Sequence, residues 1–176
     1  PQAAAERATS LLAPVLPRTR GPAEADLSAV AAPDGTSVFF CLTGAEDGWL
    51  TDFPGESAPG SVTGSITVID HVALTQPFDN FDEAALFYRS VLGLQTQHAS
   101  EVAAPFGLVR NRTVSDAQRT LRLGLSVSVL RRGEWAPGVA EPQHVAFACT
   151  DVLACARAAR AAGAPLLAIP DNYYDD

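Results

Sequence analysis

The stretches ITVIDHVALT (residues 66–75) and QHVAFAC (residues 143–149) decide the fold of this chain. Both are short runs rich in β-branched or aromatic residues, which is typical of strands. Each contains His-Val-Ala followed by Leu or Phe, beginning at His71 and His144. An alanine-containing helical stretch and a closing glycine follow each strand. The sequence therefore predicts an internal repeat of a strand–helix unit.

The two helical stretches carry matching start and stop signals. The first spans residues 79–92, with Asp79 or Asn80 as a plausible N-cap and Gly93 as the residue that ends it. The second spans residues 151–162 and shows the same acidic cap and closing glycine. We expect both helices to bury one apolar face against the strands.

Working outward, the chain offers further elements and one linker. We predict a helix over residues 2–13, a hairpin around Pro33-Asp34-Gly35, and strands over residues 106–114, 120–130 and 166–170. The helix over residues 2–13 looks like part of a third copy. Residues 53–65 are rich in Gly, Pro and Ser, which is typical of a linker. The pattern indicates repeated βαβββ units in an α+β fold that is incomplete at both ends of the chain.

Composition narrows the function classes. The formal net charge is −8, which argues against a nucleic acid or an anionic membrane as partner. No run approaches the roughly 18 apolar residues of a membrane span, and no signal peptide is visible. The three cysteines lack paired spacing, so we interpret them as small core residues and expect a cytoplasmic protein. A single arginine still suffices for a small anionic substrate.

His71 and His144 are the candidate metal ligands. A lone histidine on an apolar strand face is more often structural than functional. Here two of the three histidines occupy the same register of a repeat, which favours a shared role, and His98 has no such context. Strand alternation places His71 on one face with Ile69 and Ala73, so small neighbours leave room beside the ring. Imidazole nitrogen suits divalent Fe, Mn and Zn.

The tracts DHVALT…FDEAALFYRSVLGL and QHVAFACTDVLACARAARAAGAPLLAIPDNYYDD resemble the vicinal-oxygen-chelate superfamily of glyoxalases and dioxygenases, and in particular the C-terminal half of 4-hydroxyphenylpyruvate dioxygenases. The tract AAPDGTSVFFCL resembles the end of that family's metal-free N-terminal half. The resemblance implies mixed, curved sheets with helices outside. It also implies that residues 1–52 end a first, metal-free module, and that residues 66–176 form a second, metal-binding module, truncated after its second histidine.

The resemblance further implies a triad of His71, His144 and a Glu that lies beyond residue 176. The metal is then a divalent ion such as Mg, Mn or Fe(II). Gln143 matches a pocket-lining Gln of the dioxygenases. Ser126 stands where those enzymes carry a pocket Asn, and Arg110 aligns, less securely, with a pocket Ser. Both departures count against turnover of hydroxyphenylpyruvate itself.

Within this group, LTQPFDNFDEAALFYRSVLGL (residues 74–94) is most similar to fusion proteins that join a TIM barrel to a dioxygenase-like tail. The barrel in those proteins resembles a 3-dehydroshikimate dehydratase, which forms protocatechuate. The resemblance implies a metal-binding tail domain of such a fusion, with the N-terminal barrel as partner domain and a small aromatic or 2-oxo-acid ligand.

Two alternatives stay open at this point. One is an Fe(II)-dependent 2-oxo-acid dioxygenase, and the other is a non-enzymatic ligand-binding module with structural histidines. Exposed edges of an incomplete repeat also suggest pairing with absent segments or with a second subunit.

Overall fold

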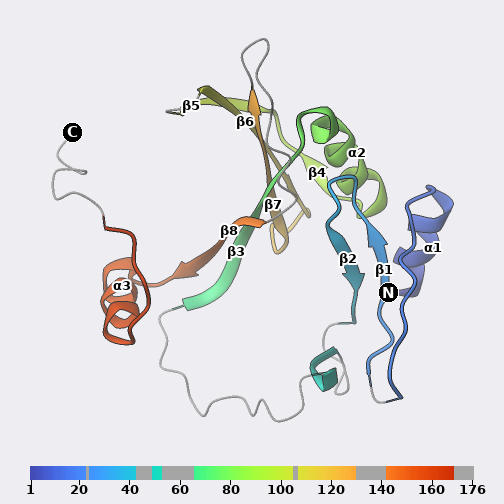
Figure 1. Ribbon diagram of the computed structural model, residues 1–176, viewed down its shortest axis with the longest axis horizontal. Helices are drawn as coiled ribbons and strands as arrows, with labels where there is room; N and C mark the ends of the chain where they lie inside the picture. Colours follow the sequence, from blue (N-terminus) through green and yellow to red (C-terminus); the bar gives the residue numbers. More distant parts are fainter. Residues whose placement is uncertain (23, 43–48, 53–65, 105–106, 130–141, 169–176) are drawn as a thin grey trace.

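The structure is a computed structural model that describes residues 1–22, 24–42, 49–52, 66–104, 107–129 and 142–168. It contains one six-stranded sheet, one two-stranded hairpin and three α-helices (Figure 1). The predicted linker over residues 53–65 lies outside these residues.

The large sheet has the strand order β4-β6-β7-β3-β8, with β5 paired to β6. Its strands are β3 (Ile66–Thr75), β4 (Gln95–Thr96), β5 (Ser100–Ala104), β6 (Gly107–Ser115), β7 (Arg122–Val129) and β8 (Pro142–Cys149). β3 runs parallel to β7 and antiparallel to β8. The parallel pair requires a crossover, and α2 (Phe81–Val91) lies within that connection. β3 therefore has a neighbour from each repeat: β7 belongs to the same repeat as β3, and β8 begins the next repeat.

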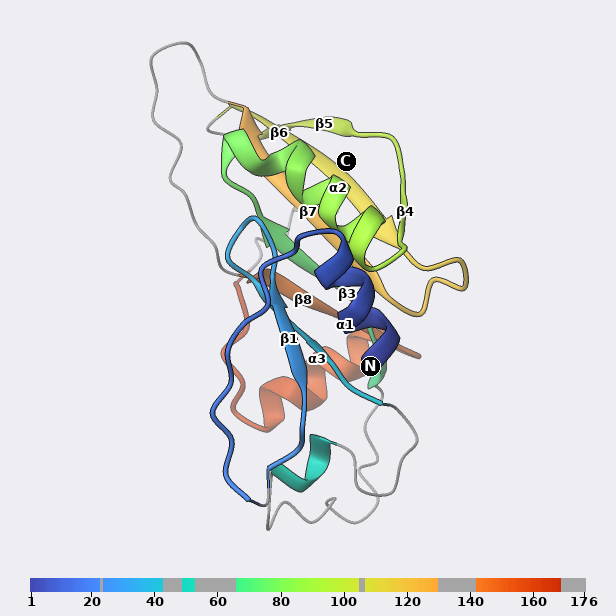
Figure 2. The same ribbon diagram turned by 90° about the vertical axis from the view of Figure 1, so that its right-hand side faces the viewer.

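The main core lies between α2 and one face of this sheet. Figure 2 shows α2 in front of β6 and β7. Helical spacing places Phe81, Ala84, Ala85, Tyr88 and Val91 of α2 in buried positions. Opposite them, Leu74, Val114, Leu125 and Val127 supply the apolar face of the sheet. The helix ends at Gly93, whose φ of +71° is the left-handed conformation that glycine adopts most easily.

The N-terminal segment packs against the outer side of α2 (Figures 1 and 2). It consists of α1 (Gln2–Ser10) and a hairpin of β1 (Ser28–Ala31) and β2 (Ser37–Phe40), followed by a short 3₁₀ turn, η1 (Trp49–Asp52). Ala8 and Val30 form a small apolar cluster with Val91 of α2.

Buried polar contacts tie the hairpin turn to the end of β3. Asp34 is 4% exposed and accepts a hydrogen bond from Gln76 Nε2 at 2.6 Å. Its other carboxylate oxygen accepts the backbone N–H of Thr36 at 3.0 Å. Asn80 of the 3₁₀ turn η2 (Phe78–Asn80) donates to the carbonyl of Pro33 at 2.8 Å. Residues far apart in sequence thus hold the hairpin on the sheet.

The structure confirms the hairpin, the strand over residues 66–75 and the two repeated helices, α2 and α3 (Val152–Ala161). It differs at five places. α3 has no buried residue, in contrast to the expected apolar face. Cys41 is exposed, so it is not the core residue that was expected. The first helix ends at Ser10, because Leu12 takes a φ of +61°. Residues 166–168 form no strand, and residues 169–170 lie outside the described part of the chain. β4 and β5 were not predicted, because β4 is only two polar residues long, β5 has no regular alternation of polar and apolar residues, and both exist by pairing with β6.

Candidate functional site

His71 and His144 meet on the open face of the sheet, where β3 pairs with β8. In the register, His71 lies opposite Ala146, and Ala73 lies opposite His144. The histidines are therefore diagonal neighbours on one face of an antiparallel pair, within reach of each other. Their Nε2 atoms are 3.2 Å apart, and the ring planes are inclined at 79°. The two histidines occupy the same position of each repeat in the sequence, and the fold places their imidazole rings next to each other.

A β-bulge beside His71 changes the expected alternation. Ile69 pairs with Phe147 and His71 with the adjacent Ala146, so Asp70 is an extra residue on β3. The expectation that Ile69 shares the face of His71 is therefore wrong, because the inserted residue moves Ile69 to the opposite face.

Asp70 connects His71 to an arginine of the neighbouring strand β7. Its Oδ2 lies 2.7 Å from His71 Nδ1, and its Oδ1 lies 3.2 Å from Nη2 of Arg122. The hydrogen bond from His71 lowers the pKa of the Asp70 carboxyl, partial desolvation opposes this shift, and the charge of Arg122 lowers the pKa further. Asp70 is therefore an anion at neutral pH. The Nε of Arg122 is buried and has no hydrogen-bond partner among the described residues.

Small and polar side chains around the two histidines leave a cavity of about 260 Å³. Besides the histidines and Arg122, its lining includes Ala73, Asn111, Thr113, Gly124 and Ser126. Gly124 lies opposite Ala73 in the parallel pair of β7 and β3, and neither residue has a side chain large enough to fill the space. The cavity is therefore lined by small side chains at Ala73 and Gly124 and by hydrogen-bonding groups at its other residues.

Ser126 lines this cavity, whereas the other two predicted pocket residues do not. Gln143 is an exposed extra residue in another bulge, between the pairs Ala73–His144 and Leu74–Pro142. Arg110 lies opposite the buried Val127, so it is on the side of the sheet that α2 covers, and its guanidinium binds Glu101 of β5 at 2.7 Å.

The residue that the sequence did not reveal is Asn111, next to Arg110. It lies directly opposite Ser126, whose Oγ donates to Asn111 Oδ1 at 2.7 Å. Because this bond uses the amide oxygen, it leaves the two hydrogens of the Asn111 amide nitrogen unused. Only the cross-strand register, which the sequence does not give to within one residue, distinguishes Asn111 from Arg110.

The donor set fits part of a metal centre. Ligand nitrogens that lie about 2.0–2.1 Å from one ion in adjacent positions are separated by about 2.9–3.3 Å. The Nε2–Nε2 distance of 3.2 Å falls within this range. Within the described ranges, no group of three or more His, Cys, Asp or Glu side chains comes together to hold a metal. The two imidazoles thus fit a divalent ion as two of its ligands.

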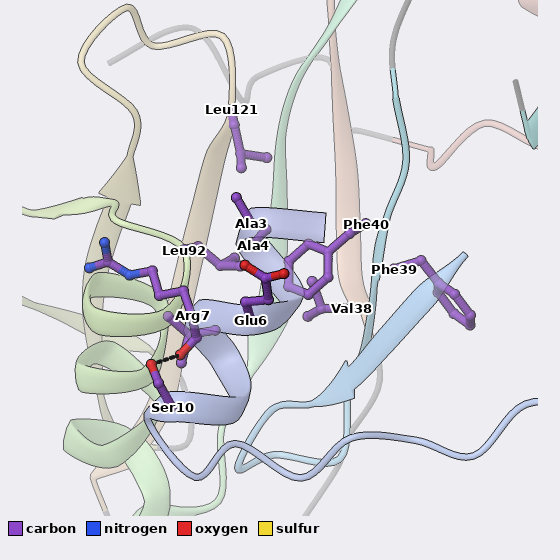
Figure 3. Close-up of a pocket in the computed structure, with 11 residues that line it drawn as sticks. Ala3, Ala4, Glu6, Arg7, Ser10, Val38, Phe39, Phe40, Leu92 and Leu121 are labelled. Carbon is purple, nitrogen blue, oxygen red and sulfur yellow. Dashed lines mark hydrogen bonds between the residues drawn. The ribbon is translucent and has the colours of Figure 1, made fainter. Parts of the chain in front are cut away.

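A second hollow, of about 910 Å³, lies elsewhere, between α1, β2 and the end of α2 (Figure 3). Val38 and Phe40 lie beside Glu6 in this view, whereas Phe39 points away. Arg7 is held by a hydrogen bond from its Nε to the carbonyl of Ser90 at 2.7 Å. The hollow is mainly apolar, and its lining residues include no histidine, so it offers no imidazole ligand for a metal.

A protein-family comparison matches residues 68–176 to the Glyoxalase/Bleomycin resistance protein/Dioxygenase superfamily. The chain belongs to this superfamily. The matched residues contain all but the first two residues of β3, together with α2, β8 and both histidines, so the repeat that organises the site lies within the superfamily domain. The architecture is the α+β fold of the superfamily, with βαβββ units, as the sequence predicted.

Curated relatives of this superfamily chain include two bacterial proteins. The 3-dehydroshikimate dehydratase of Pseudomonas putida is 35% identical over 182 residues, which cover 99% of this chain and 28% of that protein. The 3-dehydroshikimate dehydratase of Pseudomonas aeruginosa is 34% identical, over 89% of this chain and 26% of that protein. The chain thus spans less than a third of the length of these relatives.

Solved structures give a consistent result. A xylose isomerase-like TIM barrel/4-hydroxyphenylpyruvate dioxygenase fusion protein matches with a TM-score of 0.72 and 35% identity, over 99% of this chain and 28% of its own. A mutant of 4-hydroxymandelate synthase from Streptomyces coelicolor matches with a TM-score of 0.71 at 18% identity, over 98% of this chain and 53% of its own, and shares the fold. Among the described residues, no helix is long and apolar enough to cross a membrane.

Proposed function

We propose that these residues form the metal-binding, dioxygenase-like domain of a bifunctional 3-dehydroshikimate dehydratase. In this proposal the dehydration to protocatechuate takes place in a TIM barrel of the same polypeptide. The observation that carries the metal site is the 3.2 Å approach of the His71 and His144 Nε2 atoms. The relatives named 3-dehydroshikimate dehydratase support the wider assignment, together with the fusion architecture stated for the solved structure.

The proposed metal is a divalent ion, Mg, Mn or Fe(II), with a Glu from outside these residues as third ligand. When bound, it supplies Lewis acidity to a ligand with adjacent oxygen atoms. The surrounding side chains favour an oxygen-rich, anionic ligand of the aromatic or 2-oxo-acid type. Asn111 offers amide hydrogens, and the guanidinium of Arg122 supplies positive charge at the cavity lining. Gly124 and Ala73 leave the space that such a ligand needs.

Metal titration tests the centre. Co(II) added to the polypeptide should give a histidine-dependent absorption band, and His71→Ala and His144→Ala should each abolish it, since each removes one of two nitrogens. His98→Ala is the matched control, because His98 is exposed and lies outside the cavity. Binding that survives both cavity substitutions would rule out the proposed centre. Because two imidazoles alone hold a metal weakly, residues 1–176 should bind it far less tightly than a polypeptide that includes the third ligand.

Three further observations separate the functional alternatives. Oxygen uptake on hydroxyphenylpyruvate with Fe(II), lost in His71→Ala, would replace the proposal with the dioxygenase alternative. A gene whose full reading frame encodes no N-terminal barrel would remove the dehydratase fusion. Stoichiometric metal that is lost in His144→Ala would exclude a purely structural role for the histidines.

A further inference from the structure

The contact between Asp70 and His71 is unusual for neighbours in a strand. Successive side chains of a regular strand point to opposite faces, so adjacent residues do not ordinarily bond to each other through their side chains. Here the bulge makes Asp70 an extra residue, and its carboxylate reaches Nδ1 of the next side chain at 2.7 Å. The local backbone irregularity is therefore what permits the contact.

The second oxygen of Asp70 is held as well. Its Oδ1 is 3.2 Å from Nη2 of Arg122, and the two side chains are each about one-third exposed, at 33% and 35%. The carboxylate is thus fixed between two strands. Because both oxygens are engaged, and because the contact is at Nδ1 rather than Nε2, Asp70 is placed to support the histidine and not to replace it at the ion.

The geometry assigns Asp70 as the positioning residue of the proposed metal centre, an inference that rests on the proposed function. An anionic carboxylate only accepts hydrogen bonds, so His71 must carry its proton on Nδ1. The lone pair of a neutral His71 is then on Nε2, which faces His144. The carboxylate also fixes the orientation of the ring and increases its basicity. The bulge, Asp70 and Arg122 together would prepare one ligand before any metal arrives.

The tautomer of His71 can be read without metal. The chain has three histidines, so a sample labelled with ¹⁵N-histidine gives three ring systems, and His98 serves as an exposed reference. Two-bond proton–nitrogen correlation spectra at about pH 8, where a free imidazole is neutral, should show His71 protonated at Nδ1. In Asp70→Ala, the proton should shift toward Nε2. Asp82→Ala is the control, because Asp82 pairs with Arg112 outside this contact and should leave the spectrum unchanged.

Metal affinity gives the second readout. Competition of Co(II) with a chromophoric chelator should show binding that is about 10–100-fold weaker in Asp70→Ala, the usual effect of losing such a support. Asp70→Asn should recover part of it, because the amide oxygen can still accept from Nδ1. An Nε2-protonated His71 in the unmodified protein, or an unchanged spectrum in Asp70→Ala, overturns the inference even if metal binds tightly. The expected tautomer shift in a protein that binds no metal refutes the proposed centre but supports the positioning contact.

Discussion

Gly124 and Gly93 differ in what a side chain at each position would meet. Gly124 lies within β7, and an added Cβ would meet Ala73 at 3.8 Å, an ordinary contact distance. Gly93 has open space around it but a φ of +71°, which other residues adopt at a cost. Urea unfolding should therefore show Gly124→Ala to be more stable by about 0.5 kcal/mol, because glycine weakens a strand, and Gly93→Ala to be less stable by about 1 kcal/mol. The same sign for both substitutions would contradict this distinction.

Gly124 also controls the space beside the histidines. Its side of β7 faces the cavity, whereas Leu125 faces the core. A larger side chain at this position would fill the ligand space without disturbing the packing under α2. Alternate residues of β7 thus have different roles: Gly124 and Ser126 line the cavity, and Leu125 and Val127 pack in the core.

At the scale of elements, the hairpin is joined to the sheet through Asp34. Asp34→Ala should lower the free energy of unfolding by about 2 kcal/mol or more, because Gln76 then loses a partner in a buried position. Asp26→Ala is a suitable control. It removes an exposed ion pair with Arg20 and should cost less than about 1 kcal/mol. Equal urea midpoints for the two variants would show that the buried contact contributes nothing.

The elements also show what the sequence could predict. Apolar periodicity and capping residues located α2, α3 and the strands β3 and β8 that precede them, because those signals are local. The Asp151 cap is an example, since its carboxylate accepts the N–H of Ala154 at 2.9 Å. β4 and β5 depend on pairing with β6, and the Asp70 bulge depends on the register with β8. Such long-range choices leave no local pattern, and for that reason Asn111 and the face of Ile69 were missed.

At the scale of the whole molecule, a tyrosine in the buried core limits the folding stability at alkaline pH. Burial, with the nearby carboxylate of Asp34, raises the pKa of Tyr88 well above its ordinary value. The unfolded chain loses this proton near pH 10 while the folded chain retains it. Stability should therefore fall as the pH rises above about 10, by up to about 1.4 kcal/mol per pH unit. Urea unfolding across this range should show a shallower decline in Tyr88→Phe. The chain contains no lysine, so no ammonium titration overlaps. Identical pH profiles for Tyr88→Phe and the unmodified protein would contradict this prediction, because they would show that Tyr88 is not shielded from water.

His71 and His144 are 73 residues apart in the chain. Any ion that holds both of them ties the polypeptide into a long closed loop. A permanent cross-link of that length removes about 4 kcal/mol of loop-closure entropy from an unfolded chain. A bound ion acts as the reversible equivalent, with an effect set by its own affinity and concentration. An ion in the proposed centre would thus also hold β3 against β8, the two strands at which the repeats meet. Loss of the metal would then first weaken the pairing of β3 with β8, between the two repeats.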